Sequence, residues 1–171
     1  HMADGFGRVS RKPGVCFATS GPGATNILTG IATAQADSSP MVAVTGQVPV
    51  AMIGKDAFQE SDIIGMANPV VKYAFQPRTP GEVPEMVKKG FYIAETGRPG
   101  PVLIDVPKDV QQNESPMDFP EEFKIQGYHP WYDPDMVACE KAIEMLLNSE
   151  KPIILAGGGT IISSAFAELQ S

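Results

Sequence analysis

The chain is poor in cysteine and in positive charge, and it lacks a long apolar run. Its 171 residues include only Cys16 and Cys139, far apart in the sequence, and we interpret each as a small buried apolar residue rather than as a disulfide partner. Thirteen Lys and Arg against 20 Asp and Glu give a net charge of −7 with no basic block, which disfavours nucleic-acid binding. Without a bilayer-length apolar run or a signal-peptide pattern, we expect no membrane contact and a cytoplasmic location.

Histidine is also scarce, and this limits the chemistry that the residues can support. Only two histidines are present. His129 has no second histidine or acidic pair at ligand spacing, so we predict no metal site. No Ser–His–Asp or Cys–His arrangement can be argued either.

Glycine and proline, by contrast, are abundant, with 17 and 16 copies, and they separate short apolar segments. Buried strands are expected near 14–19, 41–46, 70–75 and 101–106. An alanine-rich helix is expected over 24–36. A capping box at 79–82 begins a second helix, which Gly97 ends. Alternating strands and helices predict an α/β fold with a parallel sheet and helices on both faces.

The character of the chain changes at residue 111. Residues 111–134 combine prolines, acidic residues and aromatics without a period, which predicts an ordered linker. Asp133-Pro134 then begins a helix. Residues 152–156 are expected to form a strand that turns at Gly157-Gly158-Gly159 into a short helix.

Polar loops follow the strands, where open α/β sheets bind ligands. Asn26, Gln47 and Gln59 are placed there for a small organic ligand. Gly21-Pro22-Gly23 could cradle an anion or simply form a tight turn. Gln59 is as consistent with a surface residue as with an amide donor. Lys108 ends a strand and could reach an anionic substrate, although a solvated lysine is the commoner case.

Two further positions keep both a functional and a structural interpretation. Arg98 lies among prolines and glycines that fix its backbone, which suits a presented guanidinium group. Gly157, Gly158 and Gly159 would let a ligand approach the backbone, but many turns are glycine-rich for geometry alone.

Taken together, these segments resemble one enzyme family. The chain is similar to the catalytic subunit of acetolactate synthases (acetohydroxyacid synthases), which are thiamine-diphosphate enzymes. The similarity covers essentially all 171 residues and is dense from Ala3 to Asp109. Asp56-Ala57-Phe58-Gln59-Glu60 is the most discriminating string. The segments that carry the resemblance are 3–8, 18–26, 45–49, 53–60, 97–109 and 155–159.

The resemblance implies a three-domain parent enzyme. Residues 1–112 would form a pyrimidine-binding domain that is incomplete at its N-terminus and lacks one strand–helix unit. Residues 113–134 would be the linker, and 135–171 the start of the FAD-associated middle domain. The parent would use thiamine diphosphate, FAD and Mg²⁺, while it stays open whether this chain alone binds any of them.

The resemblance also implies roles for individual residues. Pro22, Gly23 and Asn26 would lie by the aminopyrimidine. Phe58 and Gln59 would approach the substrate, and Lys108 would line the access channel. The FAD contacts would be Arg98, Gly157, Gly158 and Gly159.

The implied reaction condenses pyruvate with a second 2-oxo acid after decarboxylation, in branched-chain amino-acid biosynthesis. The parent would be a homo-oligomer, with room for a regulatory subunit. The family's catalytic glutamate and its diphosphate–metal motif have no counterpart here, so we expect the isolated chain to be inactive and to self-associate.

Two departures from the family pattern, Lys55 and the segment 71–75, concern substrate preference rather than fold. The alternatives are a segment of another thiamine-diphosphate enzyme, such as a glyoxylate carboligase or pyruvate oxidase, and a non-catalytic nucleotide-binding module.

Overall fold

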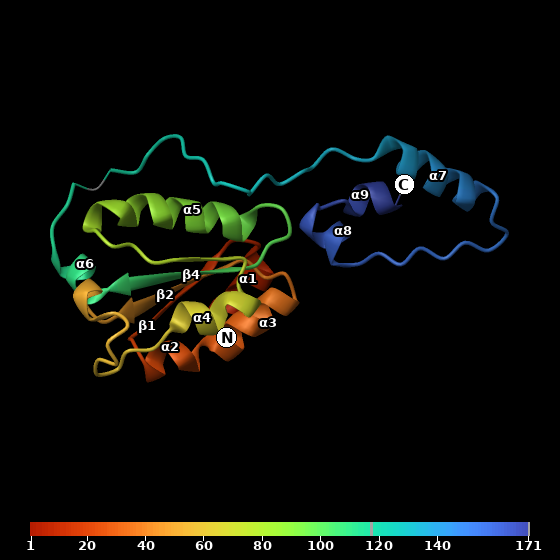
Figure 1. Ribbon diagram of the computed structural model, residues 1–171. Coiled ribbons are helices and arrows are strands. Elements are labelled where there is room, and N and C mark those ends of the chain that lie inside the picture. The colour runs from red at the N-terminus through yellow and green to blue at the C-terminus, as the bar shows by residue number, and fades with distance from the viewer. Residues whose placement is uncertain (117, 171) are drawn as a thin grey trace. The chain divides into compact units, whose positions relative to one another are not determined.

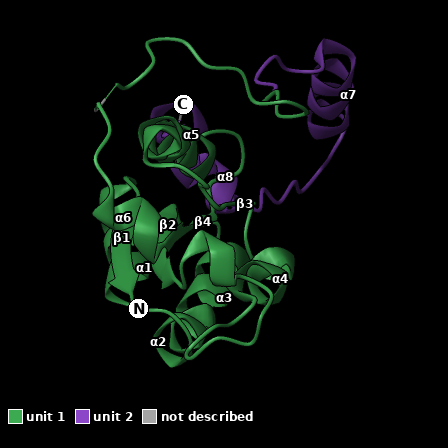
Figure 2. Ribbon diagram, turned by 60° about the vertical axis from the view of Figure 1, so that its left-hand side comes forward, with its two compact units in different colours: residues 1–130 green, residues 131–171 purple. Residues whose placement is uncertain are grey.

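A computed structural model describes residues 1–116 and 118–170. The chain divides into two compact units, residues 1–130 and residues 131–171 (Figure 2).

Unit 1 contains a sheet of four parallel strands in the order β1-β2-β4-β3 (Figure 1). The register pairs Gly14 with Met41 and Met41 with Pro101, so β1, β2 and β4 begin level at the amino edge of the sheet. Helix α5 covers one face, and α1, α3 and α4 cover the other. The predicted parallel α/β fold is therefore confirmed.

The elements of unit 1, in chain order, are α1 (Met2–Ser10), β1 (Gly14–Ala18), α2 (Pro22–Asn26), α3 (Leu28–Ala36), β2 (Met41–Gln47), η1 (Val50–Met52), α4 (Ile63–Ala67), η2 (Asn68–Val70), β3 (Tyr73–Phe75), η3 (Pro80–Glu82), α5 (Val83–Glu95), β4 (Pro101–Pro107) and α6 (Lys108–Gln112).

Both faces of the two central strands are buried, as the apolar runs predict. Val42, Val102 and Ile104 pack with Ile93 of α5 on one face. The other face packs against small residues of α3, including Ala34, which let helix and sheet approach closely. The edge strand β1 is less protected, because Phe17 is 77% exposed.

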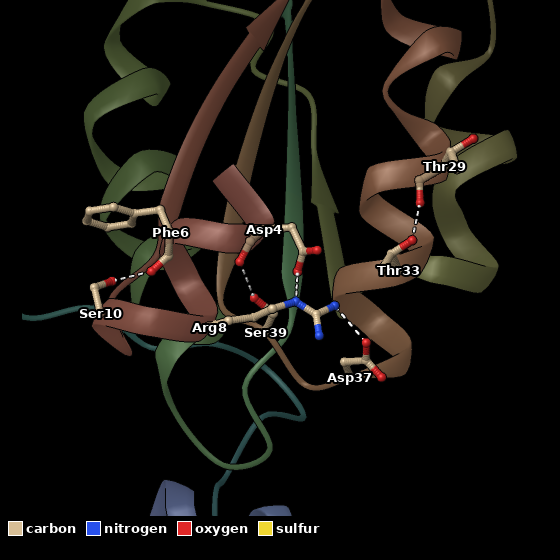
Figure 3. A network of polar contacts seen from close by, with 8 residues as sticks. All are labelled: Asp4, Phe6, Arg8, Ser10, Thr29, Thr33, Asp37 and Ser39. Carbon is tan, nitrogen blue, oxygen red and sulfur yellow. Dashed lines mark hydrogen bonds and ion pairs between the residues drawn. The ribbon is translucent and has the colours of Figure 1, made fainter. Parts of the chain in front are cut away.

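A polar network fixes the amino-terminal helix (Figure 3). Arg8 lies 2.9 Å from Asp4 in its own helix and 2.6 Å from Asp37, which follows α3. The hydroxyl group of Ser39 donates to the backbone oxygen of Asp4 at 3.0 Å. Asp4 therefore holds α1 against the segment that leads into β2, which is a structural role.

Several expected elements differ in their limits. The helix expected over 24–36 is divided at Ile27, whose N–H bonds to the oxygen of Ala24 in a tighter turn. The strand expected over 70–75 is only β3, because Pro69 lies in a preceding 3₁₀ turn. The capping box forms in part: Glu82 accepts from the N–H of Arg78, while the Thr79 side chain makes no cap bond.

Within unit 1, the second half of the predicted ordered linker packs onto α5 and Lys72. Tyr92 of α5 contacts the rings of Phe123 and Tyr128 at centroid distances of 5.4 and 6.1 Å. Lys72 donates to the hydroxyl group of Tyr128, and the amine of Lys88 to the backbone oxygen of Glu121.

Unit 2 contains α7 (Met136–Leu147), α8 (Gly158–Ile162) and α9 (Phe166–Gln170). The strand predicted over 152–156 is wrong. Residues 152–157 have no regular structure, because a strand needs a paired neighbour and the described part of this unit offers none. The expectation of a buried Cys139 is also wrong: it is exposed on α7, in a unit too small to bury that helix. Cys16 is half-buried, and burial raises the pKa of its thiol.

Candidate functional site

A cleft of about 530 Å³ opens at the carboxyl edge of the sheet. Its walls come from the ends of β1, β2 and β4, together with the loop after β1 and the start of α6. The residues that line it include Thr19, Ser20, Gly46, Gln47, Lys108 and Gln111. This is the position at which open parallel sheets bind ligands.

The Gly21-Pro22-Gly23 turn contacts the loop that holds Gln59. Gly21 has a φ of 61°, and a Cβ there would lie 2.8 Å from the backbone oxygen of Gln59. A Cβ on Gly23 would lie 2.6 Å from the Thr19 methyl group. Both glycines are therefore required by packing. The geometry also brings together two of the loops that the sequence singles out.

The loop from Ile53 to Glu60 has an unusual backbone. Gly54, Asp56 and Gln59 have φ values of 81°, 53° and 59°, a region that non-glycine residues rarely adopt. At the tip of this loop, Phe58 is 88% exposed and Gln59 is exposed. A large apolar side chain held in this way is available for contact with a ligand or with another chain.

A buried carboxylate supports the floor of the site. Asp105 of β4 is fully buried. It accepts hydrogen bonds from the Thr45 hydroxyl group at 2.7 Å, from the Gln47 amide at 3.0 Å and from the Gln76 amide at 2.8 Å. Burial raises the pKa of Asp105, and the three donors oppose that rise.

The same network changes the interpretation of Gln47. Its amide nitrogen donates to Asp105 and also to the backbone oxygen of Ser61, and its amide oxygen accepts from the N–H of Val48. Both ends of the amide are therefore used within the protein, so Gln47 orders the site, and it also lines the cleft. Sequence reasoning missed Asp105. The available signal was an acidic residue within an otherwise apolar strand, Pro101–Pro107.

The other residues that the sequence singles out lie in different places. Lys108 is the first residue of α6 and lines the cleft. Pro22 and Asn26 are the exposed ends of α2, next to the Gly21 turn.

Arg98 precedes β4 and therefore lies at the opposite, amino edge of the sheet. It donates to the Ser38 hydroxyl group at 2.7 Å and to the backbone oxygen of Ala36 at 3.2 Å. Its guanidinium group is thus partly used in holding the end of α3.

The glycine triplet belongs to unit 2. Gly157 precedes α8, and Gly158 and Gly159 form its first turn. A Cβ on any of the three would meet no atom within 4 Å, so nothing in the described structure requires glycine there.

Two negative findings concern the described residues. Among residues 1–116 and 118–170, no group of three or more His, Cys, Asp or Glu could hold a metal ion. Within the same ranges, no helix has the length and hydropathy that a bilayer span requires.

Comparison with known proteins relates the chain to a family of enzymes. Residues 1–66 match the family described as thiamine pyrophosphate enzyme, N-terminal TPP binding domain. The chain is 52% identical over 172 residues to a probable acetolactate synthase large subunit of Methanococcus aeolicus, covering 99% of this chain. It is 53% identical to a protein of that name from Methanocaldococcus jannaschii, again over 99% of this chain. It is 46% identical to the acetolactate synthase large subunit of Corynebacterium glutamicum, over 100% of this chain.

The chain spans only about 29% of the length of the two methanogen relatives and 27% of the third. Its identity with them extends well beyond the 66 residues that the family model matches, through the linker and into unit 2. The chain therefore belongs to the thiamine pyrophosphate enzymes and is homologous, from end to end, to part of an acetolactate synthase large subunit.

Proposed function

We propose that this chain forms the part of an acetolactate synthase large subunit that surrounds the aminopyrimidine of thiamine diphosphate. The parent enzyme would decarboxylate pyruvate and join the remaining two carbons to a second 2-oxo acid. The observation that carries the proposal is the carboxyl edge of the sheet, where the Gly21 turn, the Gln59 loop and Lys108 come together at or beside one cleft. About 50% identity over the whole chain to proteins of that name supports it.

The residues at this edge fit one end of the cofactor. Pro22, Gly23 and Asn26 would form the wall beside the aminopyrimidine, in a turn whose backbone is fixed by close packing. Phe58 and Gln59 would approach the substrate from the exposed tip of their loop. Lys108 would attract an anionic 2-oxo acid to the cleft. When bound, thiamine diphosphate supplies the nucleophilic carbon and the electron sink for the reaction.

The same edge lacks one group that the chemistry needs. Of the cleft-lining residues that the structure describes, none is acidic. Asp105 lies below, fully buried and bound by three donors. A general base must reach the proton that it removes, and Asp105 is enclosed. We therefore propose that the parent enzyme supplies the catalytic carboxylate, the diphosphate and the Mg²⁺ site from outside these residues, and that the isolated chain is inactive.

The finer assignments of the family are proposals of the same kind. Residues 1–112 would be the pyrimidine-binding domain, 113–134 the linker, and 135–171 the start of a middle domain. Arg98 and Gly157, Gly158 and Gly159 would contact FAD in the parent. The relatives' name, large subunit, supports a smaller regulatory partner, and the exposed face of β1 supports a homo-oligomer or further covering structure.

A segment exchange tests the proposed activity. The homologous 172 residues of the Methanococcus aeolicus relative would be replaced by this chain, and acetolactate formation from pyruvate would be measured with thiamine diphosphate, Mg²⁺ and FAD present. We expect turnover, and we expect Gln59→Ala to lower it. A hybrid that folds and assembles like the parent but forms no acetolactate would contradict the proposal.

The FAD assignment has its own variant. In the active hybrid, Arg98→Ala should weaken FAD binding more than thiamine diphosphate binding, because Arg98 lies at the sheet edge opposite the cleft. Equal loss of both affinities, or of neither, would refute the assignment.

A further inference from the structure

Glu60, one of two acidic residues in the 53–60 loop, turns its carboxylate inward, toward the loop's own backbone. One carboxylate oxygen of Glu60 accepts from the N–H of Gly54, and the other accepts from the N–H of Ala57 at 2.9 Å. The N–H of Glu60 bonds back to the oxygen of Ala57 at 2.9 Å. These bonds close the loop into a ring around a single carboxylate. They lower the pKa of Glu60, so the group is ionised at neutral pH.

The ring opposes the strain in the same loop. Three of its residues have a positive φ, and two of those, Asp56 and Gln59, are not glycine. Such conformations persist only when the surrounding structure over-determines them. The loop lies on the surface, and Gly54, Asp56 and Phe58 are exposed, so packing does little to hold it. The Glu60 carboxylate holds the loop together by accepting from the backbone N–H groups of Gly54 and Ala57.

The ring is also anchored to the sheet. The residue after Glu60 is Ser61, whose backbone oxygen accepts from the amide of Gln47 at 2.9 Å, and Gln47 donates in turn to the buried Asp105. Asp62 then caps α4 by accepting from the N–H of Gly65 at 2.9 Å. On the other side, the backbone of Gln59 lies against Gly21. The loop is thus fixed at its base and closed from within.

From this geometry we infer that Glu60 is a positioning residue, whose carboxylate holds the 53–60 loop so that Gln59 stays against Gly21 and Phe58 stays at the exposed tip. It contacts no substrate itself and acts through the two residues before it. The effect of Glu60 on catalysis rests on the proposed function, but the hydrogen bonds that close the loop do not. One measurement therefore tests those hydrogen bonds, and a second tests their effect on activity.

The first measurement is amide hydrogen exchange on the chain as it is. Gly54 is exposed, so protection of its amide must come from the hydrogen bond to Glu60 rather than from burial. We expect the Gly54 and Ala57 amides to exchange more slowly in the unmodified chain than in Glu60→Ala, with the rest of unit 1 unchanged. Glu60→Gln should be intermediate, because its amide keeps one acceptor but turns N–H groups toward the other donor. Equal exchange in all three proteins would overturn the inference.

The second measurement uses the active hybrid enzyme. Since small displacements of positioning groups are costly in rate, Glu60→Ala should lower kcat/KM for pyruvate by about tenfold or more, with the affinity for thiamine diphosphate changed by less than about threefold. Glu60→Gln should recover part of the loss. Glu95→Ala is the matched control, because it removes the same charge from the exposed end of α5 at the opposite edge of the sheet, and it should leave kcat/KM unchanged.

The outcomes distinguish the two claims. An active hybrid in which Glu60→Ala keeps its full kcat/KM overturns the inference, whatever the exchange data show. If the unsubstituted hybrid is itself inactive, the proposed function fails, and the exchange measurement alone decides whether Glu60 holds the loop.

Discussion

Replacing Asp105 should separate the cost of losing its hydrogen bonds from the cost of burying its charge. In Asp105→Ala, the donors of Thr45, Gln47 and Gln76 lose their acceptor in a fully buried place. Each lost bond costs about 1–1.5 kcal/mol. Because the variant also removes a carboxylate that is disfavoured by burial, we expect a net loss of roughly 2–4 kcal/mol in the free energy of unfolding at pH 7.

Asp105→Asn should behave differently, because the Thr45 hydroxyl group can reverse its role. The asparagine oxygen can accept from Gln47 and Gln76, while its nitrogen donates to the Thr45 oxygen, which acts equally well as an acceptor. All three contacts survive without the charge. We therefore expect a change of less than about 1 kcal/mol for this variant.

The pH dependence has a definite sign. The folded state raises the pKa of Asp105, so the folded protein binds this proton more tightly than the unfolded chain. Its contribution to stability is therefore largest below the unfolded value of 3.8 and is lost as the pH rises through the folded pKa. Relative to Asp105→Asn, the unmodified chain should gain stability as the pH falls through that window.

Urea unfolding followed by circular dichroism, on all three proteins at several pH values, provides the test. A loss below about 1 kcal/mol in Asp105→Ala, or an equal loss in Asp105→Asn, would refute the reasoning.

Three other predictions concern single features of the fold. Gly21→Ala should destabilise unit 1 by about 1–2 kcal/mol, since the added Cβ would meet the Gln59 backbone at a position with a positive φ. Gly5→Ala is the control: it adds a Cβ in open space on α1 and should be neutral or stabilising in the same urea titration. Burial lowers the pKa of Lys72 from 10.5 to about 8, so the unfolded chain binds this proton more tightly than the folded chain. The stability of the unmodified chain relative to Lys72→Gln should therefore rise between pH 8 and 10.5. A stability difference that does not change over this range would contradict the prediction. Finally, the isolated chain should form no acetolactate with added cofactors, and turnover above a no-protein control would show that a base within these residues suffices. The chain should also self-associate in analytical sedimentation, since Val15 and Phe17 expose apolar surface on the edge strand.

Sequence patterns located the parallel sheet because its central strands are continuous apolar runs between turn residues. The failures came where a neighbour decides the structure. Residues 152–156 have the composition of a strand but no partner to pair with in the described part of unit 2. Cys139 was expected to be buried because free cysteine behaves as a small apolar residue. It is exposed because no other described part of unit 2 covers its helix, α7.

At the site, the sequence indicated the loops but not their mutual arrangement. That Gln59 lies on Gly21 follows from tertiary packing between residues 38 positions apart, which no local pattern encodes. Gln47 was expected to face a ligand because it follows a strand; it lines the cleft, and its amide also bonds to Asp105, Ser61 and Val48, which no local pattern indicates. Arg98 was expected to present its guanidinium group, and the packing of α3 against the start of β4 adds two partners for part of that group, the Ser38 hydroxyl group and the backbone oxygen of Ala36.

The contacts that residues 119–130 make with α5 and with Lys72 determine where this protein can be divided. Lys72 reaches the Tyr128 hydroxyl group at 3.1 Å, and Tyr128 donates to the backbone oxygen of Thr96 at 2.8 Å. A chain cut at residue 112 would keep the whole sheet but would strip Tyr92 of both its aromatic neighbours and leave the half-buried ammonium group of Lys72 with fewer acceptors. The smallest piece worth expressing therefore ends near Pro130, and any exchange of domains between relatives should move the linker together with the sheet that it fastens.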